Sequence, residues 1–173
     1  MATKKTSMFT LTERVTISTG ATDTFATIDL GSYVDVGDRQ ALQIHSVDYI
    51  FQGTTANADV VSDLGNGNEL HVQTTDLNRG GLVFANDRAL VSSASIRADA
   101  SGSLDRVADL FPDNFGKGAD DGRYVVNDQL YITAHATNLI GPLNATVRVN
   151  ASIVSLSAKD FMAIAIQSTA ADN

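Results

Sequence analysis

The stretch Met8-Phe-Thr-Leu-Thr-Glu-Arg-Val-Thr-Ile-Ser-Thr19 alternates between two kinds of side chain along its length. From Thr10 to Ser18 one row is polar. The other, from Phe9 to Ile17, is apolar except for Glu13, and its apolar members are Phe9, Leu11, Val15 and Ile17. A repeat of two residues is that of a β-strand with one face in the core. The stretch therefore predicts a long strand in a sheet that is buried on one side.

Seven further segments of strand length follow, separated by turns rich in Gly, Asn and Asp. They are Thr24–Leu30, Ala41–Phe51, Glu69–Thr75, Leu82–Ala85, Ala89–Ala98, Tyr124–Ala136 and Ala145–Leu156. Within Ala41–Phe51 the apolar row changes phase between Ile44 and Val47. That change predicts a β-bulge, or a strand that is covered on both faces.

Two segments depart from the strand repeat. In Ser103–Phe111 the apolar residues recur at helical spacing behind a Ser N-cap and stop at Pro112, which predicts a short helix inserted in a long connection. The tail Ser157–Gln167 fits two interpretations. Ser157 and Asp160 resemble a capping box and favour a helix, whereas Met162, Ile164 and Ile166 also alternate as in a strand.

The length and composition of the chain indicate one folded domain. The chain has 173 residues and 43% hydrophobic residues, enough for a sizeable core, and no cysteine to form disulfides or thiolate sites. We expect a flexible arm over residues 1–7 and one domain over residues 8–173. Neither a transmembrane segment nor a signal peptide is expected, so we expect synthesis in a cytoplasm.

The charge disfavours one class of partner. At pH 7 the formal net charge is −8, and a compact acidic body repels the phosphates that dominate nucleic-acid binding. Lys4 and Lys5 in the arm are the local exception. We therefore expect no strong nucleic-acid binding by the body of the domain.

The residue types that carry chemistry do not gather in the sequence. His45, His71 and His135 each lie in the middle of a strand segment, where a surface or cross-strand partner is the expected role. The acidic, glycine-containing loops Asp63–Glu69 and Asp113–Asp121 lack the spacing of an EF-hand. We predict no catalytic, cofactor-binding or metal-binding residues, no cofactor and no enzymatic activity.

Together these elements predict an all-β fold: an eight-stranded antiparallel β-sandwich of jelly-roll type, with a short helical insertion and a short C-terminal helix or strand. The polar arm Met1–Ser7 leads directly into a long first strand. The segments Tyr124–His135 and Asn144–Val154 resemble the closing hairpin of a small viral coat protein. In length and strand count the chain is similar to the single jelly-roll capsid proteins of tailless icosahedral viruses of bacteria or archaea.

The resemblance implies a structural protein that assembles with copies of itself into a virion. Other virion proteins and an internal membrane beneath the shell are further partners that it allows. The loops Gly53–Gly67 and Phe111–Arg123 would reach neighbouring subunits, and the edge strand Met8–Thr19 would pair with a neighbour or be guarded by Glu13 and Arg14. The alternative is a receptor- or glycan-binding β-sandwich, such as a phage spike or tail-associated module.

Overall fold

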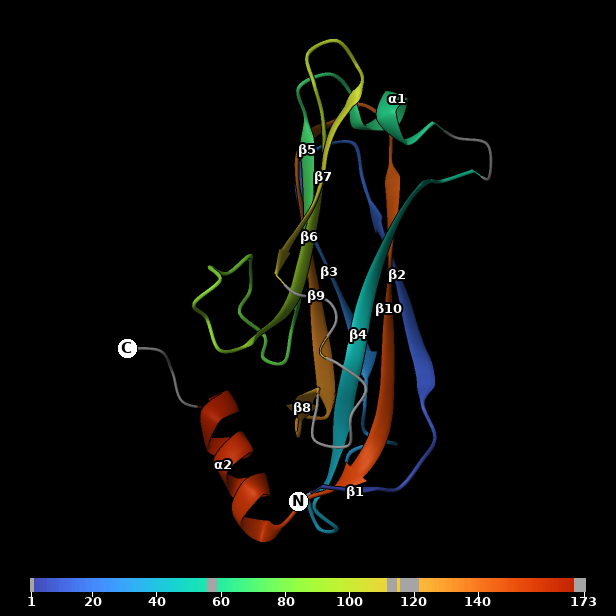
Figure 1. The fold of residues 1–173 in the computed structure, drawn as a ribbon. Coiled ribbons are helices and arrows are strands. Elements are labelled where there is room, and N and C mark those ends of the chain that lie inside the picture. Colours follow the sequence, from blue (N-terminus) through green and yellow to red (C-terminus); the bar gives the residue numbers. More distant parts are fainter. Residues whose placement is uncertain (1, 56–58, 112–114, 116–121, 170–173) are drawn as a thin grey trace.

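Two antiparallel sheets face each other and enclose the core (Figure 1). The computed structural model describes residues 2–55, 59–111, 115 and 122–169. The first sheet contains β1 (Thr3–Lys4), β2 (Phe9–Ile17), β4 (Gln40–Gly53), β8 (Arg123–Val125) and β10 (Leu143–Ser155). The second contains β3 (Gly20–Asp29), β5 (Glu69–Thr75), β6 (Leu90–Ala98), β7 (Leu104–Phe111) and β9 (Gln129–Leu139).

The chain passes back and forth between the two sheets. In the first sheet, β10 lies between β4 and the pair β2 and β1, and β4 is followed by β8. In the second sheet the order is β3, β9, β5, β6, β7. Apart from the run β5, β6 and β7, consecutive strands from β2 to β10 lie in opposite sheets, which is the interleaved connectivity of a jelly roll. The predicted fold class is confirmed.

Strand β10 forms the centre of the first sheet because it is paired on both sides. Val147 lies opposite Glu13 of β2 and Tyr49 of β4. Its side chain and that of Val149 are fully buried between the sheets, together with Ile132 of β9. Burying apolar area stabilises the fold by about 25 cal/mol per Å², so this interior is the main source of stability.

The phase change predicted in Ala41–Phe51 is a β-bulge in β4. Val47 pairs with Val149, but Ile44 pairs with Ala151, so β4 has one residue more than β10 over this span. His45 occupies the extra position. The bulge turns both Ile44 and Val47 toward the core, which explains why the sequence pattern shifts there.

The helix predicted over Ser103–Phe111 is wrong, because this segment contains strand β7, which pairs with β6. A tight turn joins the two strands. The Asp99 carboxylate accepts hydrogen bonds from the backbone N–H groups of Ser101 (2.8 Å) and Ser103 (2.9 Å), and Gly102 adopts a φ of 83°. Ser103 therefore belongs to a hairpin turn and not to a helix N-cap.

Three other expectations need correction. Leu82–Ala85 is loop and not strand. The segment predicted as one strand over Tyr124–Ala136 divides into β8 and β9, which belong to different sheets. The stretch Gly53–Gly67, expected to be an exposed loop, contains the short helix α1 (Val60–Leu64), whose Leu64 is fully buried.

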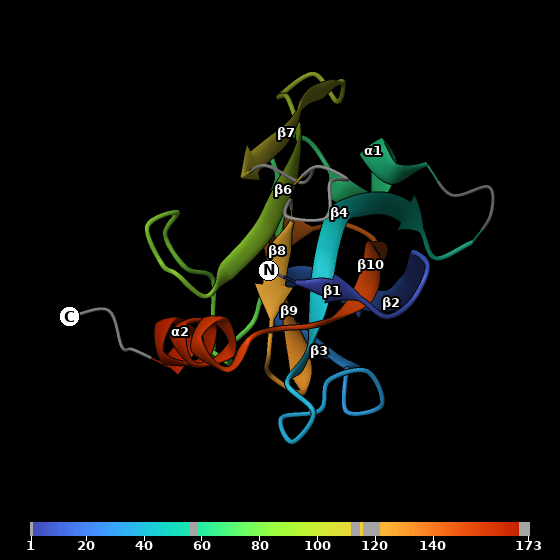
Figure 2. The same ribbon diagram turned by 60° about the horizontal axis from the view of Figure 1, so that its bottom comes forward.

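The tail forms a helix, α2 (Ala158–Thr169), as the capping pattern favoured. The Ser157 hydroxyl accepts a hydrogen bond from the Asp160 N–H (3.1 Å) and donates one to the Asp160 carboxylate (2.7 Å). Phe161 anchors α2 in a small apolar cluster with Val126 and Leu156. Ile164 and Ala165 pack against the same cluster. The helix lies beside the sandwich, on the same side as the loop between β5 and β6 (Figures 1 and 2).

The first residues of the chain carry β1, in which Thr3 pairs with Ser155 and Lys4 with Val154. The division into a flexible arm (1–7) and a single domain (8–173) stays a prediction. Among the described helices, none combines the length and apolar character required to cross a bilayer.

Candidate assembly surface

The three histidines take structural positions. His45 is buried in the bulge of β4, where its Nε2 lies 2.9 Å from the Ser152 hydroxyl. On the outer face of the second sheet, His135 contacts Asp23 (2.5 Å) and His71 contacts Glu69. These are the surface and cross-strand roles that the sequence predicts. In the described part of the chain, no three His, Cys, Asp or Glu side chains are placed to hold one metal ion.

The structure describes only part of the loops that the sequence singled out. The backbone oxygen of Asp63 accepts hydrogen bonds from Ile140 (2.9 Å) and Gly141 (2.8 Å), so this acidic loop helps to close one end of the sandwich. Apart from Phe115, Gly122 and the strand ends, the acidic loop Asp113–Asp121 and the loop Phe111–Arg123 lie outside the described residues.

Strand β2 has the features of a guarded edge. It pairs with β10 on one side, with Glu13 half-buried on its inward row and Arg14 exposed on the outward row. A charge that points inward on an edge strand discourages uncontrolled pairing. Pairing of β2 with a neighbouring subunit stays a prediction.

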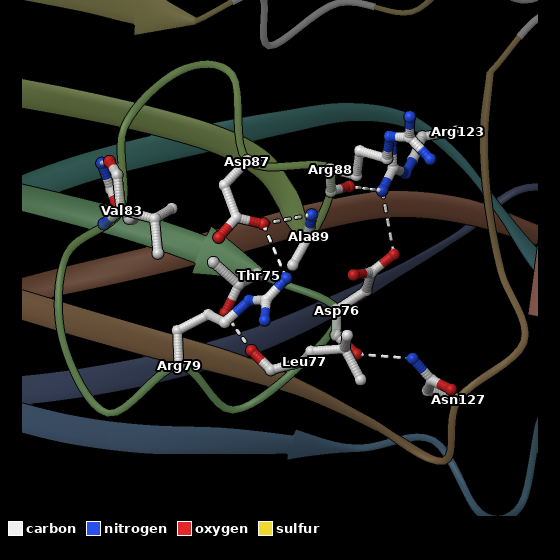
Figure 3. A network of polar contacts seen from close by, with 11 residues as sticks. Thr75, Asp76, Leu77, Arg79, Val83, Asp87, Arg88, Ala89, Arg123 and Asn127 are labelled. Atoms are coloured by element: carbon white, nitrogen blue, oxygen red, sulfur yellow. Dashed lines mark hydrogen bonds and ion pairs between the residues drawn. The ribbon is translucent and has the colours of Figure 1, made fainter. Parts of the chain in front are cut away.

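The best-defined surface feature is the loop between β5 and β6, residues 76–89, here called the braced loop (Figure 3). Asp76 opens it and is 2% exposed. Arg123 donates to the Asp76 carboxylate (2.9 Å), and the Asn127 side chain donates to the Asp76 backbone oxygen (2.6 Å). Because Arg123 belongs to β8, these contacts tie the loop of the second sheet to the first sheet.

Burial dominates the electrostatics of Asp76. It raises the pKa of this carboxyl above its ordinary value, although the Arg123 guanidinium pulls the pKa the other way. One carboxylate oxygen, Oδ1, is buried without a hydrogen bond from the described residues. Charged Asp76 is therefore costly to bury, and Arg123 offsets only part of that cost.

The far half of the braced loop is fixed from two sides. The Gln73 side chain on β5 accepts from the Val83 N–H (2.8 Å) and donates to the Val83 oxygen (2.9 Å). The Asp87 carboxylate accepts from Arg79 (3.0 Å) and from the Ala89 N–H (2.8 Å). A turn between them is closed by the Asp87 N–H, which donates to the Phe84 oxygen (3.0 Å).

Phe84 lies between these two fixed points, and its side chain is 87% exposed. A phenyl ring normally packs in the interior, so a well-fixed loop that holds one in solvent is a feature that stability does not explain. Exposed, rigidly presented aromatic residues are typical anchors of protein interfaces.

A hollow of about 530 Å³ lies on the outer face of the second sheet. Its walls include two aromatic side chains, Phe25 of β3 and Tyr131 of β9, and Phe25 is 55% exposed. Thr27 of β3, Thr133 of β9, and Asn78 and Gly80 of the braced loop also line it.

The sequence interpretation missed this surface. The apolar run Leu82–Ala85 is consistent with a short strand, but the Val83 backbone bonds to the Gln73 side chain instead of a neighbouring strand. The signal that could have revealed a built loop is the set of charged residues Asp76, Arg79 and Asp87 between two strands. The Asp87 side chain accepts from the Ala89 backbone N–H, a group that a sheet would otherwise pair, while Asp76 and Arg79 bond to charged side chains.

Comparisons with known proteins give a likeness in structure. No family model and no curated protein sequence matches the chain. VP1 of trichodysplasia spinulosa-associated polyomavirus, solved in complex with 3'-sialyllactose, superposes with a TM-score of 0.51 at 10% sequence identity, over 89% of this chain and 96% of that chain. The unassembled VP1 pentamer of Merkel cell polyomavirus gives a TM-score of 0.48 at 7% identity, over 90% and 98% of the two chains. At 10% identity the likeness to the first of these structures defines the fold alone, which is a single jelly roll over most of the chain.

Proposed function

We propose that the protein is a structural subunit, a self-assembling viral capsid protein built on a single jelly roll. The observation that carries the proposal is the fold: its strand order is that of a jelly roll, and it resembles the VP1 capsid protein over 89% of the chain. Jelly rolls of this kind are used in viral shells, where one domain contacts several copies of itself.

The polar clusters of the molecule support a structural role. Asp76 and Arg123 fix a loop, and the contacts of His71 and His135 are with carboxylates on the same face of the sheet. Each of these arrangements holds backbone or side chains in place. We therefore propose no catalytic role for them.

The finer part of the proposal concerns the virus. We propose a tailless icosahedral virus of bacteria or archaea, with the protein located in the virion. Other virion proteins and an internal membrane beneath the shell are proposed partners. The net charge of −8 supports a shell whose genome is packaged without a strongly basic coat.

A glycan-binding module is the second candidate, and the hollow supports it. Aromatic side chains such as Phe25 and Tyr131 offer faces on which sugar rings can pack, and Asn78 and Thr27 offer hydrogen-bonding groups. The VP1 structure with TM-score 0.51 contains 3'-sialyllactose. A glycan array on the wild-type chain tests this candidate, and binding that Phe25→Ala abolishes would favour it.

The proposed function is tested by measuring particle size. The purified chain is studied by light scattering and negative-stain electron microscopy at low and high salt, with and without divalent cations. Rings, capsomers or shells are the expected result. A monomer in every condition would contradict the proposal.

A further inference from the structure

Two features of the surface match each other in chemistry. One is Phe84, the exposed ring at the tip of the braced loop, and the other is the hollow with Phe25 and Tyr131 in its walls. We propose that Phe84 of one copy docks in the hollow of a second copy. The proposal rests on the proposed function, because it names the contact by which the subunits associate.

The sizes are compatible. A hollow of about 530 Å³ falls within the range of roughly 300–1,000 Å³ that is typical of ligand pockets, so it has room for a phenyl ring. An aromatic side chain that becomes buried removes about 150–250 Å² of surface from water. Rings that meet edge to face or offset, as Phe84 would meet Phe25 or Tyr131, gain further attraction from their quadrupoles.

The braced loop holds Phe84 in place before any partner arrives. Val83 on one side is held by Gln73 at 2.8 and 2.9 Å, and Asp87 on the other is held by Arg79 and Ala89. A side chain whose backbone is already ordered loses less conformational entropy on binding. The loop therefore has the properties of a preorganised anchor.

The charges beside the two features are opposite. Arg88 is exposed four residues after Phe84. Asp23 and Asp29 are exposed on the outward row of β3, two residues before Phe25 and two residues after Thr27, and Asp23 also contacts His135. A second copy thus brings a cation toward acidic residues that flank the hollow along β3, whereas a nucleic acid or an anionic membrane would bring charge of the same sign.

Cysteine cross-linking tests the contact directly, because the chain has no cysteine of its own. Two single variants, Ala85→Cys and Thr27→Cys, are purified separately, with one enlarged by a tag so that mixed pairs can be identified by mass. Ala85 is exposed next to Phe84, so a cysteine at this position leaves the Phe84 ring in place. They are then combined under mild oxidation. We expect a mixed disulfide-linked pair to form at least about tenfold faster than in the control mixture of Val36→Cys and Thr27→Cys, since Val36 is exposed on a different loop.

The outcomes separate this inference from the proposed function. Particles of the wild-type chain together with equal cross-linking in both mixtures would overturn the Phe84 contact and leave the capsid proposal standing. A monomeric wild-type chain without preferential cross-linking would overturn both. Selective cross-linking of Ala85→Cys with Thr27→Cys supports the contact, and loss of this selectivity in the Ala85→Cys, Arg88→Asp variant supports the role of charge.

Discussion

Strand β10 and the braced loop are held in place by different forces. β10 lies between two strands, with Val147 and Val149 fully buried in an apolar interior. The braced loop is held by directed polar contacts around Asp76, Val83 and Asp87 (Figure 3). It presents Phe84 to solvent. The core is therefore built for stability, while the loop keeps an aromatic ring exposed at a fixed position.

This difference separates two measurable properties. Removing apolar volume from the core should lower the free energy of unfolding. Removing the exposed ring of Phe84 should leave that free energy almost unchanged and weaken association between copies. Substitutions that remove the contacts around Asp76 should affect both the free energy of unfolding and association between copies. These contacts stabilise the loop and also determine where its tip points.

The largest effect on stability is expected in the core. Ile132 is fully buried, and Ile132→Ala leaves a cavity in the centre of the sandwich. We expect the free energy of unfolding to fall by about 2–5 kcal/mol, measured by urea denaturation. Val36→Ala, at an exposed position, is the matched control and should change it by less than about 0.5 kcal/mol. Equal changes in the free energy of unfolding for Ile132→Ala and Val36→Ala would contradict the assignment of Ile132 to the core.

A smaller effect is expected where the loop joins the first sheet. Arg123→Ala removes the partner of the buried Asp76 carboxylate and a donor to the Arg88 backbone oxygen. We expect a loss of about 1–3 kcal/mol in urea denaturation, because a buried polar group is left unsatisfied. Arg148→Ala is the control, since Arg148 is exposed on β10. If the control is as destabilising as Arg123→Ala, the bracing role of Arg123 is wrong.

The pH dependence of stability should differ between two carboxylates. Burial raises the pKa of Asp76 above 3.8. The contribution of this carboxyl to the free energy of unfolding is therefore fully present below pH 3.8 and is lost as the pH rises through the folded-state pKa. Relative to Asp76→Asn, the wild-type chain should therefore lose stability as the pH rises through this window. Denaturation of both proteins across this range of pH measures the difference.

Asp99 in the β6–β7 turn provides the opposite case. The Ser101 hydroxyl, with the turn N–H groups, lowers the pKa of Asp99 below 3.8. Its contribution is present above pH 3.8 and is lost as the pH falls through the folded-state pKa. Relative to Asp99→Asn, the wild-type chain should lose stability as the pH falls. For each variant, the difference in free energy of unfolding between wild type and variant is plotted against pH. Slopes of the same sign for Asp76→Asn and Asp99→Asn would contradict the opposite pKa shifts of the two carboxyls.

The smallest effect on stability is expected at the tip of the loop. Phe84→Ala should change the free energy of unfolding by less than about 0.5 kcal/mol, since the ring has few contacts to lose. Thermal denaturation at a concentration low enough to keep the chain monomeric measures this change. A loss comparable to that of Ile132→Ala would show that Phe84 packs within its own subunit.

The sequence predicted the elements whose pattern depends on local geometry. The phase change between Ile44 and Val47 marked a real bulge, and the Ser157 and Asp160 pair marked the start of α2. The helix predicted at Ser103–Phe111 failed because pairing with β6, a non-local interaction, overrides a helical repeat of a few residues.

The periodicity of the sequence could not predict the candidate surface. Leu82–Ala85 form an apolar run of strand length, and the exposure of Phe84 depends on Gln73, which lies ten residues before Val83 and bonds to it. Likewise, the hollow combines residues of β3, β9 and the braced loop, so it exists only after the sheets have formed.

The central claim is that this domain assembles with copies of itself through the braced loop. Sedimentation velocity over a concentration series, with wild type, Val36→Ala and Phe84→Ala in parallel, tests it most directly. Our account predicts that wild type and Val36→Ala form large particles, while Phe84→Ala stays folded and sediments mainly as a monomer. A wild-type chain that remains monomeric at every concentration, or a Phe84→Ala variant that assembles as the wild type does, would contradict it.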